Sequence, residues 1–142
     1  VQVSDEGLLT VRVTNEDASW LLEEDEKWKK LLVKLCDVAV DVEVEEEKWR
    51  GFVKVQLPEG EHSEDSKSAL WFTQCIRAMA ALRAGADVVA MPDVESHPCV
   101  SVVLVPDDNI KGFIRGKNGA RLQDWSYAHQ AVMVIAEPQP VE

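Results

Sequence analysis

The sequence contains few cysteines and histidines, and their spacing does not indicate a cross-link or a metal site. The three cysteines, Cys36, Cys75 and Cys99, lie far apart in the 142 residues and form no CxxC pair. This pattern argues against a disulfide framework or a zinc ribbon, so we expect reduced thiols. The three histidines also lack the spacing of metal ligands. We therefore predict no metal site and no cofactor.

Long hydrophobic runs are also absent. A transmembrane helix needs a run of about 18 or more apolar residues, and the sequence has none, so we expect no membrane partner. The N-terminus lacks the basic and apolar regions of a signal peptide. This absence and the reduced thiols favour the cytoplasm or the nucleus. Because the first residue is valine, we expect the chain to be a fragment of a longer protein.

The charge is strongly negative and unevenly distributed. There are 26 acidic and 15 basic residues, giving a net charge of −11, and 46% of the residues are hydrophobic. Such a composition is typical of one folded domain or two small ones. Acidic runs at Glu23–Glu26 and Glu43–Glu47 lie in the first half and repel a phosphate backbone. A solvated surface is the simpler interpretation of these runs, and a docking surface for a basic protein is the alternative.

The hydrophobic pattern of residues 1–86 predicts alternating strands and helices. Strands are expected over Leu8–Thr14, Val38–Val44 and Trp49–Leu57, and helices over Ala18–Cys36 and Glu64–Ala84. Valine alternates with other residues from position 38 to 44, which is typical of a strand with one buried face. The acidic residues at 23–26 interrupt the apolar face of the first helix, so a turn between two shorter helices is expected there.

The second half begins with a connection in which Val88–Met91 is a candidate short strand. A buried strand is predicted over Val100–Val105, followed by a turn and a helix N-cap within Pro106–Asn109. A short helix, a glycine loop, a second helix and a strand over Ala131–Ala136 complete the predicted order.

The glycine loop, Gly116-Lys117-Asn118-Gly119, is the segment that indicates a binding chemistry. Glycine lets the backbone come close to a ligand, and the N–H groups at the start of the following helix favour an anion. The surrounding basic residues are Lys111, Arg115, Lys117 and Arg121. They make the segment locally basic in an acidic chain. A tight turn between two helices is the purely structural alternative for an isolated GxxG motif.

The loop and its flanks resemble the core of a KH domain. The resemblance covers Val100–Glu137 and rests on the loop together with Val105-Pro106, Ile110, Gly112, Ile114, Leu122, Met133 and Ile135. In that family the GxxG loop clamps about four nucleotides of single-stranded nucleic acid, and an apolar groove receives the bases. Arg115 and Trp125 depart from the family pattern, which usually has aliphatic residues at these positions.

The resemblance implies a set of RNA-binding residues in this chain. Gly116, Lys117, Asn118 and Gly119 would hold phosphates. Ile110, Gly112, Ile114 and Met133 would line or support the groove. Lys111, Arg115 and Arg121 would provide the basic flank.

The first half follows the order strand, helix, helix, strand, strand, helix of a complete KH domain. Glu23–Glu26 stands where the GxxG loop belongs, which implies a degenerate unit. We therefore predict an α+β fold of tandem KH-like units, each a three-stranded sheet packed by helices. The expected boundaries are 1–86 for the first unit, 87–99 for a linker and 100–142 for the second. The second unit is either truncated or built in the bacterial order, with helix 64–84 and Val88–Met91 as its leading elements.

Two functional hypotheses follow from these features. The first is single-stranded RNA binding by the second unit, weak on its own because the chain lacks an overall basic surface, and part of a larger multi-KH protein. The alternative is a protein-interaction or structural module whose acidic first half docks a basic protein. An enzyme is not predicted, because no nucleophile–base pair stands out and the loop lacks the Lys-Ser or Lys-Thr of a P-loop.

Overall fold

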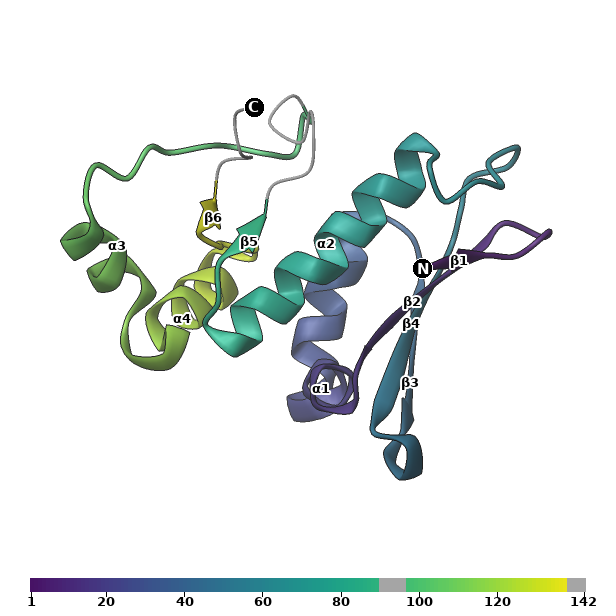
Figure 1. Cartoon of the computed structure of the whole chain (residues 1–142), viewed down its shortest axis with the longest axis horizontal. Helices are drawn as coiled ribbons and strands as arrows, with labels where there is room; N and C mark the ends of the chain where they lie inside the picture. Colours follow the sequence, from purple (N-terminus) through teal and green to yellow (C-terminus); the bar gives the residue numbers. More distant parts are fainter. Residues whose placement is uncertain (90–96, 138–142) are drawn as a thin grey trace. The chain divides into compact units, whose positions relative to one another are not determined.

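The structure, a computed structural model, describes residues 1–89 and 97–137 and combines helices with strands (Figure 1). The chain divides into Val1–Ala80, called unit 1 here, and Ala81–Glu142, called unit 2. This division falls inside helix α2 (Lys67–Ala84), whereas the expected boundary followed the helix. Residues 90–96 of the expected linker and 138–142 of the expected second unit lie outside the described residues. The predicted α+β class is confirmed.

Unit 1 contains an antiparallel sheet of four strands in the order β1-β2-β4-β3. The strands are β1 (Gln2–Val3), β2 (Leu8–Thr14), β3 (Val40–Glu45) and β4 (Arg50–Gln56). The last three correspond to the three predicted strands, and β1 is an additional short strand beside β2. Val42 lies opposite Val53, so β3 and β4 form an antiparallel hairpin.

Helix α1 (Asn15–Cys36) and the part of α2 in unit 1 lie on one face of this sheet (Figure 1). The buried strand side chains are valines and one leucine, and Leu9, Val53 and Val55 are fully inaccessible. Burying one such side chain contributes about 1.5–3 kcal/mol. Between the helices, the indole N–H of Trp71 donates to the carbonyl of Leu35 at 3.4 Å. Buried and exposed residues alternate along the strands, so the hydrophobic core lies on one face of the sheet.

Gly51 is required where α1 crosses β4. A Cβ atom built on Gly51 would overlap the Cβ of Ala18, which is itself fully buried. The helix thus packs directly on the backbone of the strand at this position.

Helix α1 is interrupted at Glu23–Glu26, as predicted. Glu24, Asp25 and Glu26 have φ values of 49°, 58° and 60°, a left-handed conformation that costs a non-glycine residue about 1–2 kcal/mol. Trp20 and Trp28, on either side of the kink, stack with ring centroids 4.6 Å apart. Stacking of this kind holds the two halves of the helix together across the strained turn.

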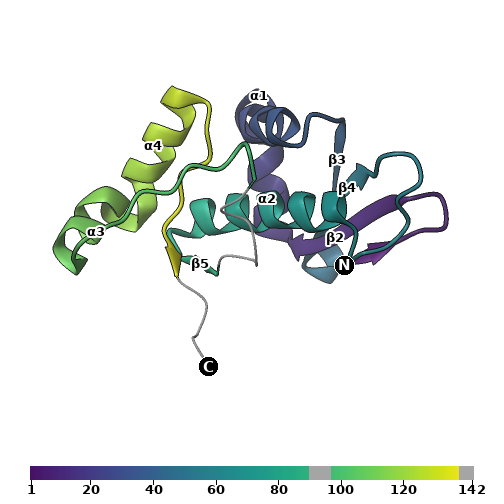
Figure 2. The same cartoon turned by 90° about the horizontal axis from the view of Figure 1, so that it is seen from above.

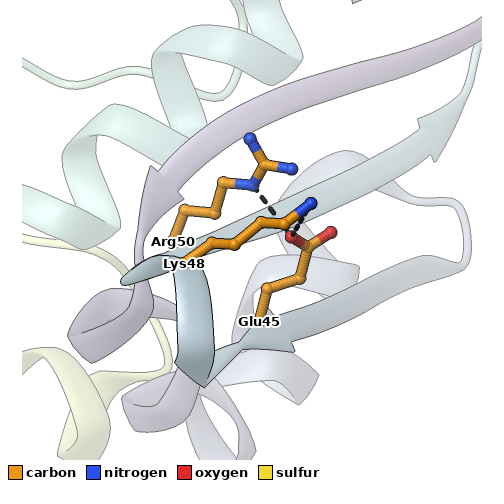
Figure 3. A network of polar contacts seen from close by, with 3 residues as sticks. All are labelled: Glu45, Lys48 and Arg50. Carbon is orange, nitrogen blue, oxygen red and sulfur yellow. Dashed lines mark hydrogen bonds and ion pairs between the residues drawn. The ribbon is translucent and has the colours of Figure 1, made fainter.

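The acidic run at Glu43–Glu47 is partly neutralised within the β3–β4 hairpin, whose turn contains the short helix η1 (Glu46–Lys48). The Glu45 carboxylate lies 2.9 Å from Nε of Arg50 and 4.0 Å from Nζ of Lys48 (Figure 3). Glu43 pairs with Lys54 of the adjacent strand at 3.0 Å. The hairpin therefore presents alternating charges.

Beyond the end of α2, the described residues of unit 2 form two helices, a short connecting turn and two short strands. The elements are β5 (Val88–Val89), α3 (Asp108–Arg115), η3 (Lys117–Gly119), α4 (Ala120–His129) and β6 (Ala136–Glu137). Figure 2 shows α3 and α4 joined by the loop that contains η3. Strand β5 pairs in parallel with β6, with Val88 opposite Ala136. The candidate strand at residues 88–91 thus belongs to the sheet of unit 2 as far as it is described.

Two strand predictions in unit 2 are wrong. Val100–Val105 forms no strand, and Val103 and Leu104 are 83% and 90% exposed. The predicted strand Ala131–Ala136 is reduced to its last residue, which pairs with β5. The two described strands of unit 2 also fall short of the expected three. A β-branched run becomes a strand only when a partner completes its hydrogen bonds, and here β5 pairs with β6 instead.

Candidate nucleic-acid interface

The glycine loop begins where helix α3 ends. Asp107 caps the start of α3, because its Oδ1 accepts the N–H of Ile110 at 2.9 Å, which confirms the predicted N-cap. The helix ends at Gly116, whose N–H donates to the carbonyl of Gly112 at 3.1 Å. Gly116 has a φ of +72°, so the chain leaves the helix in a conformation that glycine adopts without strain.

The backbone geometry of the turn requires both loop glycines. A Cβ atom on Gly116 would lie 2.7 Å from the Cβ of Arg121. Gly119 is buried and has a φ of +79°, and a Cβ there would lie 2.7 Å from the Cα of Gly85. The glycines thus have a structural function that does not depend on a ligand. The helix–helix turn, which was the structural alternative for the motif, is present.

The two residues between these glycines point into solvent. Lys117 and Asn118 are exposed, and the φ of +54° at Asn118 is one that asparagine tolerates better than most residues. Within residues 1–89 and 97–137, no ion pair of Lys117 is found. The first turn of α4 holds no acidic residue, and no side chain caps it. The Lys117 ammonium is therefore available to an anion beside this helix N-terminus, where the first N–H group, that of Ala120, donates to the Lys117 carbonyl.

Two further predicted cations of the interface contact a single carboxylate. Nζ of Lys111 lies 2.9 Å from Oδ2 of Asp87, and Arg115 pairs with the other oxygen of the same carboxylate. Burial raises the pKa of Asp87, but the hydrogen bond from Lys111 and the charge of Arg115 outweigh this effect and hold the pKa below its usual range. Asp87 is thus ionised and compensates charge that would otherwise face a phosphate.

Arg121, the fourth cation, lies on an aromatic ring. Its guanidinium carbon lies 4.1 Å from the ring centroid of Phe113, and its Nη1 donates to the Phe113 carbonyl. The Phe113 side chain is 64% exposed, although it was not among the predicted RNA-binding residues. The sequence signal for Phe113 as a binding residue is its position, one helical turn before a basic glycine loop, because unpaired bases stack on aromatic side chains.

The predicted groove residues are only partly brought together. Ile110 and Ile114 lie one turn apart on α3, the first exposed and the second half-buried. Gly112 is exposed, with open space where a Cβ would be. Met133 follows α4 and is half-buried, and its N–H donates to the buried Ser126 hydroxyl at 2.9 Å. Met133 thus supports the end of α4.

Comparisons with protein-family models, with curated protein sequences and with solved structures find no match for this chain. In the part of the chain that the structure describes, no three His, Cys, Asp or Glu side chains form a group that could hold a metal ion. Across the same residues, no helix is long and apolar enough to span a membrane.

Proposed function

We propose that unit 2 binds single-stranded RNA and that the loop Gly116–Gly119 holds the phosphate backbone, as in the KH domains that this segment resembles. The observation that carries the proposal is the exposed pair Lys117 and Asn118 beside the uncapped N-terminus of α4. An ammonium, a side-chain amide and helix N–H groups together form a favourable set of donors for a phosphate.

The affinity of this unit alone is expected to be low. The whole chain has a net charge of −11, and Asp87 compensates the charges of Lys111 and Arg115. Affinity for a single strand falls with added salt with a logarithmic slope of about 0.7 per neutralised phosphate. Among the described basic residues around the loop, Lys117 and Arg121 have no ion pair, and these two cations can neutralise few phosphates, so we expect a shallow salt dependence. Tight binding then requires further RNA-binding units joined in one chain, in line with a multi-KH protein.

The double variant Lys117→Asp, Asn118→Asp tests the proposal. Both side chains are exposed, so the substitutions change the charge of the loop and leave the core intact. We expect RNA binding to be lost in fluorescence anisotropy at low salt. The control Asn15→Asp, Lys30→Asp makes the same changes of charge in α1 and should bind like the wild type. Equal affinity of the loop variant and this control would refute the assignment.

A protein-interaction module is the second candidate, and the exposed run Val102–Leu104 favours it. An extended, apolar and β-branched segment suits the addition of a strand from a partner protein. In that case Val103→Glu should abolish capture of a purified partner in the absence of RNA, and the loop variant should still bind that partner. Loss of partner binding in the loop variant alone would contradict this candidate.

A further inference from the structure

An aromatic ring and a guanidinium stack on each other beside the glycine loop. Phe113 is in the last turn of α3, and Arg121 is in the first turn of α4. The guanidinium carbon is 4.1 Å from the ring centroid, and the same side chain donates a hydrogen bond to the Phe113 carbonyl. This second contact fixes the guanidinium over the ring. Because the Phe113 side chain is 64% exposed, the pair presents planar surface to solvent.

The pair continues on both helices into exposed apolar surface. Ile110 precedes Phe113 by three residues, and Trp125 follows Arg121 by four, so each lies on the same helix face as its neighbour. Both of these large side chains are exposed. We call the set of Ile110, Phe113, Arg121 and Trp125 the stacking strip. Large exposed apolar side chains at this helical spacing, next to a stacked ring and guanidinium, point to a contact site.

The stacking strip lies directly against the phosphate-binding loop. The position of a Cβ on Gly116 is only 2.7 Å from the Cβ of Arg121, and Arg121 is two residues beyond Gly119. A nucleotide whose phosphate contacts Lys117 therefore has its base within reach of the strip. Unpaired bases stack on aromatic rings and on arginine planes, and exposed stacking surfaces are common in proteins that bind single strands.

We propose that Phe113 and Arg121 form a platform on which one nucleobase stacks while the loop holds the adjacent phosphate. This inference rests on the proposed RNA-binding function and adds the way in which the base is held. Every base has a π face, so such a platform contributes affinity with little preference for sequence. It also gives Arg121 a function in RNA binding that does not require a salt bridge to phosphate.

The test compares two probes with the full chain. One is a fluorescein-labelled uridine octamer, and the other is the same ribose–phosphate backbone without bases. The wild type should bind the uridine octamer more tightly than the abasic one. Phe113→Leu should weaken uridine binding by at least about fivefold and leave abasic binding unchanged, because stacking on one aromatic residue accounts for an effect of this size. Phe113→Tyr should retain the preference.

Three further measurements separate the platform from other effects. Phe113→Leu keeps the backbone carbonyl that Arg121 contacts, and amide NMR spectra should show an unchanged fold. Trp49→Leu removes another exposed aromatic residue, in unit 1, and should not alter binding of either probe. Arg121→Lys keeps the positive charge but removes the planar guanidinium, so it should reduce the preference for the uridine octamer over the abasic one.

The outcomes distinguish the two proposals. If Phe113→Leu binds the uridine octamer within about twofold of the wild type while the loop variant does not bind, the platform is refuted and the loop assignment stands. If the wild type binds neither octamer, the proposed RNA-binding function itself is refuted, and the platform with it.

Discussion

Gly119 packs against Gly85 so closely that a methyl group on Gly119 would lie 2.7 Å from the Cα of Gly85. The obstacle is backbone and not a flexible side chain, so it cannot move aside without displacing the end of α2. Gly119, the second glycine of the GxxG motif, therefore packs the loop against the end of α2. Loss of RNA binding on substitution of Gly119 would not by itself show a contact with RNA.

We predict that Gly119→Ala destabilises unit 2 by more than about 1 kcal/mol, because the substitution combines a steric clash with a φ of +79°. The matched control is Gly112→Ala in α3, where the space is open and alanine is the better helix former. It should stabilise the helix by about 0.5–1 kcal/mol. Urea denaturation followed by NMR resonances of unit 2 measures both effects. Equal stabilities of the two variants would contradict the packing argument.

The second prediction concerns the carboxylate that compensates the interface cations. Asp87→Asn should raise the affinity for RNA, because Lys111 and Arg115 then become available to phosphates. The logarithmic salt slope should increase by up to about 1.4, or 0.7 for each new phosphate contact.

The matched control for this prediction is Lys111→Gln, Arg115→Gln. In the presence of Asp87 it leaves the carboxylate without its two cations, so RNA affinity should fall below that of the wild type. In the Asp87→Asn background it should abolish the gain. If Asp87→Asn still raises RNA affinity when both cations are absent, Asp87 does not act by pairing with Lys111 and Arg115.

The third prediction is a pH dependence of the stability of unit 2. The pKa of Asp87 is lowered in the folded state, so its ion pairs contribute stability that is fully present above the unfolded-state pKa of about 4. This contribution should be lost as the pH falls through the lower folded-state pKa. The difference in stability between wild type and Asp87→Asn should therefore shrink below about pH 4. A difference that stays constant from pH 6 to the acid limit would contradict this.

The fourth prediction tests the strained kink of α1. Asp25 has a φ of 58°, which glycine adopts without penalty, so Asp25→Gly should stabilise unit 1 by about 1 kcal/mol. Lys30→Gly, at an exposed position after the kink, should instead destabilise the same helix by about 1 kcal/mol. Chemical denaturation followed by NMR resonances of unit 1 reports both effects. Destabilisation by Asp25→Gly would show that the kink is held by interactions of the Asp25 side chain.

Local patterns in the sequence were sufficient to predict most of unit 1. The alternating valines indicated β3 because one face of that strand is buried, and the acidic residues at 23–26 indicated the interruption of α1. The contact of Gly51 with Ala18 gave no local signal, since it depends on how α1 crosses a strand that is distant in sequence.

Unit 2 was harder to predict because its structure depends on long-range pairing. The run Val100–Val105 has the composition of a strand, but β6 pairs with β5 instead. The loop was recognised from its glycines and its basic flank. The pairing of Asp87 with Lys111 joins residues far apart in the sequence, so composition suggested free cations where the structure has ion pairs.

The most direct test of RNA binding by the loop is an amide-resolved NMR titration of the full chain with short random single-stranded RNA at low salt. We expect shifts confined to residues around Ile110–Leu122, with those of Phe113 and Lys117 among the largest. No shifts, or shifts only in unit 1, would contradict RNA binding by the loop.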